Sequence, residues 1–226
     1  MPPPRTADAR INPVSMVTQV TERIRHWIVT GELPAGSFSI TDLATRLGVS
    51  HIPVREAIRH LATEGLVTLR PARGGEVRPM NSDDVKGIYG LRLEIEPNLA
   101  AKGAALLTAE DLERLRAIMA ESAGASDDEQ ISAHRQIYFG VMEHAMTEWD
   151  QRIWDYLFTA NERYARFLLA ADHGSDRDRE TRLMEQEYLD IVETRNPKKV
   201  RAATIAHLER NQALILELLA ERDGAG

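Results

Sequence analysis

The sequence predicts a mainly α-helical protein: a winged helix-turn-helix of three helices and a small β-hairpin, followed by an all-α bundle of six to seven helices. Three observations lead to this prediction. Residues 43–77 read as a helix, a turn, a second helix and a glycine-containing hairpin. From residue 82 onward, apolar residues recur at helical spacing, and no segment alternates as a strand does. The length of 226 residues suits two modest domains.

The chain is expected to divide into an arm and two domains. Residues 1–13 contain four prolines and are expected to form a flexible N-terminal arm. Residues 14–79 then form the first domain, and residues 80–226 form the second. The first helix covers about residues 15–30, because its apolar positions are spaced three or four apart. These inward positions are Val17, Val20, Ile24, Trp27 and Ile28.

The second helix of the first domain is delimited by its capping residues. Ser39 is a good N-cap for a helix that carries Leu43, Ala44 and Leu47. Gly48 follows the last apolar position and supplies the C-terminal stop, because glycine readily adopts the left-handed conformation. This short helix and its tight turn are the first half of a helix-turn-helix.

The third helix is predicted to be the recognition helix. We expect Ser50 to cap it, and a proline in its first turn costs little because that N–H has no partner in the helix. One buried stripe is formed by Val54, Ala57, Ile58 and Leu61. The opposite side offers His51, Arg55 and Arg59, which suit base edges and phosphates in the major groove. The alternative is that the two arginines form a solvated helix face.

The segment after this helix reads as a wing. Residues 67–69 are predicted to form one strand and residues 76–78 its return, around a turn that contains Gly74. Arg70 and Arg73 flank that turn, and a narrow, charged hairpin tip suits the minor groove or the phosphate backbone. A complete helix-turn-helix with a wing therefore favours double-stranded DNA as the partner.

Charge is divided unequally along the chain. Residues 1–80 hold 10 Lys+Arg against 7 Asp+Glu, whereas the remainder holds 18 against 28, so a basic head precedes an acidic body. The overall charge of −7 does not exclude DNA binding, because affinity follows the local field at the contact face. The sequence has no cysteine and no apolar run long enough to cross a membrane. We therefore expect a cytoplasmic protein with no membrane partner.

Helical periodicity continues through the second domain. Breaks fall near Thr108, at residues 124–128, at Thr147, at residues 172–175 and at Asn196–Pro197. The helices between them are predicted at 82–105, 108–122, 128–146, 149–172, 177–195 and 197–222.

Polar residues stand within the apolar stripes of these helices. Arg92 lies among Val85, Ile88, Ile95 and Leu99, and five helices carry such residues in all. The set comprises Arg92, His134, Tyr138, Asn161, Glu185, His207 and Asn211. In the last helix, the row that carries His207 and Asn211 is expected to include Leu214 and Leu218. Buried polar groups cost about 1–3 kcal/mol each unless they are satisfied, so a shared polar cavity is the economical explanation.

The polar cavity predicts an effector site. Arg92 is the expected clamp for a carboxylate or phosphate, because a guanidinium binds such groups bidentately. One alternative is a purely structural polar network without a ligand. A remote alternative is a metal-dependent hydrolase, since a His-Glu-His set beside an arginine resembles its minimal site. Against catalysis, the sequence contains no HExxH pair, nucleophile elbow or phosphate-binding glycine loop.

The first domain resembles the winged helix of the GntR family of bacterial transcription regulators. The resemblance covers residues 16–79 and rests on GVSHIPVREAI-x-x-L-x-x-E-G-L-V and R-G-G-x-V. The family usually has Arg-Thr where this chain has His51-Ile52, so one expected guanidinium contact is absent. The DNA contacts that the resemblance implies are Ser50, His51, Arg55, Arg73 and Gly74, with Arg59 as a weaker addition.

The second domain resembles the FCD effector domain of the FadR subfamily of these regulators. The resemblance covers most of residues 83–210 and rests on YGLRLEIEPNLAAKGA, HRQIYFGVMEHA and RNPKKVRAATIAHL. Many such domains hold a divalent metal through one aspartate and three histidines, which correspond here to His134, Tyr138, Glu185 and His207, with Gln186 the alternative to Glu185. Only His207 keeps the family's residue type. His134, Glu185 and His207 are thus candidate ligands for one zinc, nickel or manganese ion per chain.

Together these features predict a ligand-responsive bacterial repressor. One winged helix reads only a few base pairs, so a homodimer on an inverted-repeat operator is expected. The expected effector is a small organic acid, bound near Arg92 and His207. Its binding would shift the first bundle helix, which follows the wing through Arg78-Pro79-Met80. The alternative is an effector-independent DNA-binding dimer.

Overall fold

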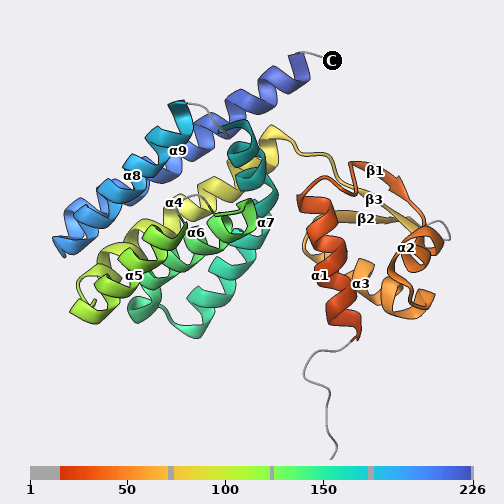
Figure 1. Ribbon diagram of the computed structural model, residues 1–226, viewed down its shortest axis with the longest axis horizontal. Helices are drawn as coiled ribbons and strands as arrows, with labels where there is room; N and C mark the ends of the chain where they lie inside the picture. The colour runs from red at the N-terminus through yellow and green to blue at the C-terminus, as the bar shows by residue number, and fades with distance from the viewer. Residues whose placement is uncertain (1–15, 71–73, 123–124, 173–175, 225–226) are drawn as a thin grey trace, which may run out of the picture. The chain divides into compact units, whose positions relative to one another are not determined.

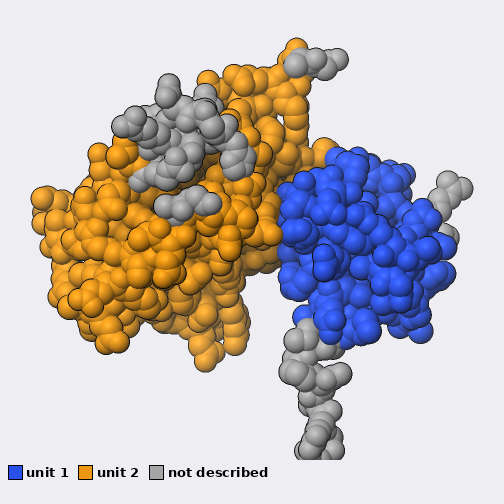
Figure 2. Space-filling view, viewed as in Figure 1, with its two compact units in different colours: residues 1–78 blue, residues 79–226 orange. Residues whose placement is uncertain are grey.

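The computed structural model describes residues 16–70, 74–122, 125–172 and 176–224. The chain forms two compact units, residues 1–78 and residues 79–226 (Figure 2). Each unit has hydrophobic clusters of its own. The predicted arm, residues 1–13, lies outside the described residues.

The first unit is a winged helix-turn-helix (Figure 1). Its elements, in chain order, are α1 (Met16–Val29), β1 (Gly36–Phe38), α2 (Ile40–Leu47), α3 (His51–Thr63), β2 (Val67–Arg70) and β3 (Gly74–Val77). Helix α1 packs on α3, where Ile24, Val54, Ile58 and Leu61 are fully buried. The apolar stripes predicted for these two helices therefore form the core that fixes the orientation of α3.

The sheet of the wing has one strand more than the sequence predicted. Its antiparallel order is β1-β3-β2, with Gly36 and Val67 both opposite Val77. Strand β1 has only three residues, too few for an alternating pattern to be recognised. Strand β1 forms by pairing with the edge of β3 that β2 leaves open. The predicted hairpin, β2 and β3, is thus the larger part of a three-stranded sheet.

The caps of the helix-turn-helix agree with prediction at two of three positions. The Ser39 side chain accepts hydrogen bonds from the backbone N–H groups of Thr41 and Asp42, and Gly48 ends α2 at φ +66°. Ser50 stands at the predicted N-cap position of α3 with extended backbone, but its side chain makes no capping hydrogen bond. The reason is local: Pro53 occupies the third helical position, where a cap commonly finds its donor, and proline has no N–H.

The second unit is all-helical in its described residues. Its elements are α4 (Ser82–Ala104), α5 (Ala109–Ser122), α6 (Asp127–Met142), the short 3-10 helix η1 (Glu143–Ala145), α7 (Glu148–Asp172), α8 (Asp176–Glu193) and α9 (Pro197–Gly224). The predicted helix 128–146 therefore ends earlier, at Met142, and continues as a 3-10 turn. Helices α4 and α9 share the most extensive packing in this unit.

The buried stripe of α9 differs from the predicted one near its C-terminal end. The buried positions are Val200, Thr204, Leu208, Ile215 and Leu219. Leu214 and Leu218, which the sequence placed in the core, are half-buried. The stripe advances by four, four, seven and four residues, as a long helix with 3.6 residues per turn requires, and the predicted row drifted off this register.

Membrane insertion finds no support in these helices. Among the residues that the structure describes, no helix combines the length and the apolar character needed to cross a membrane.

Candidate functional site

The exposed face of α3 presents the residues predicted to contact DNA. His51, Ile52, Arg55 and Arg59 are all exposed, Ile52 to 73%. Arg59 pairs with Glu56 one turn earlier, at 2.8 Å between Nη1 and Oε1. Arg55 makes no hydrogen bond or ion pair with any other residue that the structure describes. The guanidinium of Arg55 is therefore available to an external anion, whereas Arg59 would first release Glu56.

In the wing, the predicted DNA contact at Gly74 needs correction. Gly74 is buried, with φ at +103°, and a Cβ there would lie 2.3 Å from the carbonyl oxygen of Phe38. Glycine is thus needed for the close approach of β1 to β3, and Gly74 does not belong to the exposed contact face. Arg70 forms an ion pair with Glu76 across the hairpin. Arg73 lies outside the described residues.

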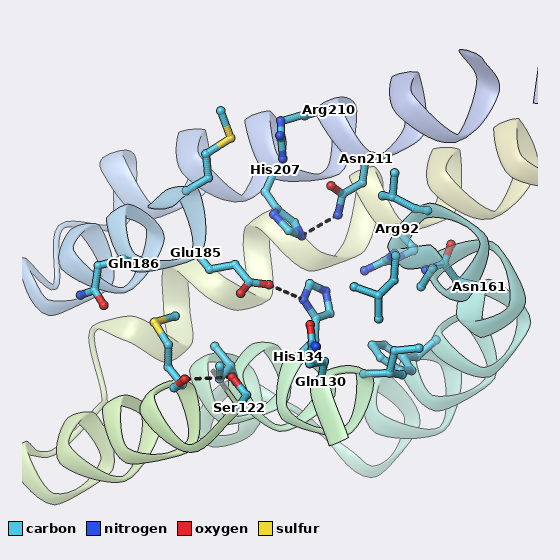
Figure 3. Close-up of a pocket in the computed structure, with 18 of the residues that line it drawn as sticks. Arg92, Ser122, Gln130, His134, Asn161, Glu185, Gln186, His207, Arg210 and Asn211 are labelled. Atoms are coloured by element: carbon cyan, nitrogen blue, oxygen red, sulfur yellow. Dashed lines mark hydrogen bonds and ion pairs between the residues drawn. The ribbon is translucent and has the colours of Figure 1, made fainter. Parts of the chain in front are cut away.

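The second unit contains a partly open cavity of about 530 Å³ (Figure 3). Side chains from α4, α5, α6, α7, α8 and α9 line it. Six of the seven residues predicted for the effector site are among them: Arg92, His134, Asn161, Glu185, His207 and Asn211. The seventh, Tyr138, is buried and contacts the lining residue His207. The structure therefore brings the polar residues of five apolar stripes to one place.

Arg92 has a partner that the sequence analysis missed. Its Nε lies 2.6 Å from Oε1 of Glu96 and its Nη2 lies 3.2 Å from Oε2, and each residue is 1% exposed. Burial acts to lower the pKa of Arg92, but Glu96, Tyr89 and Tyr138 together raise it by more, so the guanidinium stays charged. The expected role of Arg92 as an open carboxylate clamp is therefore wrong: Glu96 already occupies the fork.

Tyr89 and Asn161 extend this buried pair. Burial raises the pKa of the Tyr89 hydroxyl, and the nearby Arg92 charge and a hydrogen bond from Asn161 partly oppose that effect. The other end of the Asn161 amide is unsatisfied, since Oδ1 is buried without a hydrogen-bond partner among the described residues. Asn161 itself is 5% exposed. Glu96, Arg92, Tyr89 and Asn161 thus form one buried polar group, in which Asn161 Oδ1 is left unsatisfied.

His207 is held from both sides. Asn211 Nδ2 lies 3.0 Å from its Nε2, and the Tyr138 hydroxyl lies 2.9 Å from its Nδ1. Burial lowers the pKa of His207 well below its usual value, and His134, Arg92 and Arg210 lower it further. The imidazole is therefore neutral at pH 7. The Asn211 amide donates to Nε2, which leaves the Nδ1–H to donate to the Tyr138 oxygen.

These contacts do not fit a divalent metal at the predicted ligands. His134 and Glu185 pair with each other at 3.1 Å between Nδ1 and Oε1 (Figure 3). Both ring nitrogens of His207 are hydrogen-bonded, and burial raises the pKa of Tyr138, which keeps it a neutral phenol. A metal would need His207 to lose one of its partners.

Within the described residues, three potential metal-binding side chains converge only elsewhere, at Asp111, Glu143 and His144. Asp111 there accepts hydrogen bonds from Thr108 and lies 3.0 Å from His144. Arg114 forms ion pairs with both Asp111 and Glu143. The Arg114 guanidinium therefore already neutralises these carboxylates. The cluster links α5 to η1 and does not offer an open metal site.

Comparison with known proteins decides the family. Residues 16–77 match the family described as bacterial regulatory proteins, gntR family, and residues 87–210 match the FCD domain. The chain belongs to the GntR family and carries an FCD domain. The predicted resemblance is thus confirmed in both domains, and the FadR subfamily is consistent with this pairing.

Relatives of this GntR protein are regulators. It is 28% identical over 227 residues to the HTH-type transcriptional regulator BphR of Paraburkholderia xenovorans (strain LB400), covering 92% of this chain and 90% of the relative. It is 34% identical to the HTH-type transcriptional repressor RspR of Escherichia coli (strain K12), over 105 residues and 46% of each chain. This GntR protein is a transcription regulator and not an enzyme, so the hydrolase alternative is set aside.

Solved structures share its fold. McbR/YncC of E. coli superposes with a TM-score of 0.75 at 22% identity, covering 90% of this chain and 98% of the other. A GntR family member from Pseudomonas syringae pv. tomato str. DC3000 superposes with a TM-score of 0.55 at 24% identity, covering 92% and 88%. At these identities the similarity establishes the fold.

Two buried neighbours of Arg92 in the GntR protein, the pocket-lining Tyr89 and the ion-pair partner Glu96, escaped the sequence analysis. Glu96 and Tyr89 are each 1% exposed, and both act on Arg92. A signal for Glu96 was present, because an arginine and a glutamate four residues apart face each other on a helix. Tyr89 gave no such signal, since an aromatic residue in an apolar stripe reads as ordinary core.

Proposed function

We propose that this regulator represses transcription as a homodimer on an inverted-repeat operator and that a small organic acid in the bundle pocket releases it. The observation that carries the proposal is the pocket of the second unit, where charged and polar side chains gather within an otherwise apolar lining. An effector-independent regulator would gain nothing from such a cavity.

The proposed DNA contacts lie on the recognition helix and the wing. Ser50, His51 and Arg55 are exposed at the N-terminal end of α3, the part of a recognition helix that meets base edges. Arg55 is the strongest member, because its charge is not neutralised by a described residue. Arg59 is weaker because of Glu56. Arg73 is retained from the sequence alone.

Two of the helices that line the pocket, α4 and α9, are connected to the segment that follows the wing. Helix α4 carries Arg92 and begins at Ser82, five residues after β3 ends. Helix α9 carries His207, and its Arg222 donates a hydrogen bond to the carbonyl of Met80 at 3.1 Å. An acid that contacts α4 and α9 would therefore act on residues 78–81 in two ways. It would act through the covalent link to α4 and through the hydrogen bond from Arg222. The difference between the acid's affinities for two arrangements of α4 and α9 would set the change in operator affinity.

The proposed homodimer is supported by an apolar stripe on α7. Trp149, Ile153 and Tyr156 are 68%, 46% and 53% exposed and follow one another at helical spacing. Glu148 and Arg152 beside Trp149 pair with each other at 3.3 Å on the exposed surface, and two copies related by a two-fold axis can exchange these partners reciprocally. A second copy of this chain is thus the occupant that the stripe suits.

An effector-independent dimer remains the second candidate because the polar core is largely self-satisfied. The pairs Arg92–Glu96, His134–Glu185 and His207–Asn211 account for most of its polar groups. The cavity itself favours an effector.

Selection of duplexes from random DNA, followed by sedimentation of the complex, tests the proposal. We expect an inverted repeat that holds two chains per duplex. Titration of that complex with small carboxylic and hydroxy acids should then lower its affinity. One chain per duplex would overturn the homodimer, and an operator affinity that no acid alters would favour the effector-independent candidate.

A further inference from the structure

We infer that Ile52 selects a thymine in each half-site of the operator, by packing its apolar side chain against the 5-methyl group of that base. Ile52 follows His51 at the N-terminal end of α3. The inference rests on the proposed DNA contacts of α3. It adds to them a specificity-determining residue that reads a base without any hydrogen bond.

The first step is the exposure of Ile52. At 73% exposure it is the most exposed of the large apolar side chains in the part of the chain that the structure describes. It stands apart from the hydrophobic cluster of the first unit, to which the same helix contributes Val54, Ala57, Ile58 and Leu61. Single exposed apolar residues are common on protein surfaces, so exposure alone assigns no role to Ile52.

The second step is the place of Ile52 on the recognition helix. Residues 52, 55 and 59 are spaced by three and four, so Ile52 shares one side of α3 with Arg55 and Arg59. All three are exposed, and Ile52 is the nearest of them to the N-terminus of the helix. The N-terminal residues of a recognition helix meet base edges in the major groove. When Arg55 contacts the DNA, Ile52 is therefore placed against a base.

The third step is the chemistry of the side chain. Isoleucine has no hydrogen-bond donor or acceptor in its side chain, so it satisfies none of the polar groups on the base edges. Thymine alone presents an apolar group in the major groove, its 5-methyl. Branching at Cβ restricts rotation about χ1, so Ile52 loses little side-chain entropy when it contacts that methyl. The base that Ile52 favours is therefore thymine.

Replacement of thymine by uracil tests the inference, because it removes the methyl and leaves the polar edge of the base unchanged. Each thymine in one half-site of the selected operator is replaced in turn, and fluorescence anisotropy measures the affinity of the full chain. We expect one position at which the wild-type affinity falls about fourfold, the effect of burying one methyl group. A half-site that contains no selected thymine would overturn the inference, as would one in which no uracil weakens binding.

Substitution of Ile52 completes the test. At the sensitive position Ile52→Ala should bind thymine and uracil equally, whereas Ile52→Val, which keeps a branched apolar side chain, should keep part of the preference. Leu106→Ala removes another exposed apolar side chain, in the second unit, and should keep the full preference. Because Ile52 is exposed, its substitution leaves the core of the domain intact. An undiminished preference in Ile52→Ala would overturn the inference, since another residue would then contact the methyl.

The outcomes separate this inference from the proposed function. Sensitivity to uracil that depends on Ile52 would support thymine selection even if no acid releases the operator. An inverted repeat that binds two chains, is released by an acid and tolerates uracil at every position would overturn the inference and support the proposed repressor. Failure to select any duplex from random DNA would overturn both.

Discussion

Arg92 and Glu96 form a buried ion pair within one turn of α4, with Nε and Oε1 2.6 Å apart. Each side chain is at most 2% exposed. The pair places a full positive and a full negative charge in the bundle core, where they cancel each other, and Arg92 also lines the pocket. It therefore determines both the stability of α4 in the bundle and the chemistry that the pocket can offer.

Removing one partner of this pair should be costly. Glu96→Gln leaves the Arg92 charge buried without its carboxylate, for which we expect a loss of about 3–5 kcal/mol in the free energy of unfolding. Urea denaturation measures it, with the exposed Glu94→Gln on the same helix as the control, expected within about 0.5 kcal/mol of wild type. The double variant Arg92→Met/Glu96→Leu should recover most of the loss. A Glu96→Gln effect below about 1 kcal/mol would contradict the pair's importance.

His207 should make stability depend on pH. Its pKa is lowered in the folded protein, so between that value and about 6.5 the unfolded chain binds the extra proton. The contribution to stability is complete above pH 6.5 and is lost as the pH falls toward the folded pKa. Between pH 7.5 and 5.5 we expect a loss of about 1.4 kcal/mol from this group. Urea unfolding of wild type and His207→Gln at both pH values measures the difference, and equal pH dependence in the two proteins would exclude the effect.

Metal analysis tests the contacts of His207. Tyr138 and Asn211 occupy both ring nitrogens, so we expect less than one-tenth of an equivalent of zinc, nickel or manganese in the purified wild-type protein and in His207→Ala. A chelator should leave the melting temperature of the wild-type protein unchanged. About one metal ion per chain in wild type, lost in His207→Ala, would show that the hydrogen bonds to His207 yield to a metal.

Operator binding should depend on Arg55 more than on Arg59. Loss of the Arg55 guanidinium removes an unneutralised contact, and Arg55→Ala should cost about 1–3 kcal/mol of binding free energy. Arg59→Ala should cost less, because Glu56 already pairs with Arg59. Fluorescence anisotropy at several salt concentrations measures both, with the exposed Arg23→Ala on α1 as the control. Equal losses in Arg55→Ala and Arg23→Ala would mean that α3 does not face the DNA.

Most of the fold could be predicted because its determinants are local. The apolar spacing of α1 and α3 and the stop at Gly48 each act within a few residues. Strand β1 depends instead on pairing with β3, whose partner residues lie about 40 positions later. The missing cap at Ser50 depends on Pro53 having no N–H, which outweighs the general preference for serine.

The members of the pocket were predictable and their partners were not. Polar residues within apolar stripes located Asn161 and His207 correctly in one cavity. Which groups neutralise each other depends on rotation between packed helices and on side-chain reach. The spacing of Arg92 and Glu96 allows an ion pair, but spacing alone does not decide whether Glu96 or an effector fills the Arg92 fork.

The central claim is that occupation of the bundle pocket controls DNA binding, and a pocket-filling variant tests it most directly. Ala165 lines the pocket on α7, whereas Ala170 on the same helix is exposed. Operator affinity is measured with and without small carboxylic and hydroxy acids in wild type, Ala165→Phe and Ala170→Phe. We expect all three to bind the operator alike without acid, and at least one acid to weaken binding tenfold in wild type and Ala170→Phe but less than twofold in Ala165→Phe. An equal response in all three proteins, or none in wild type, would contradict the account.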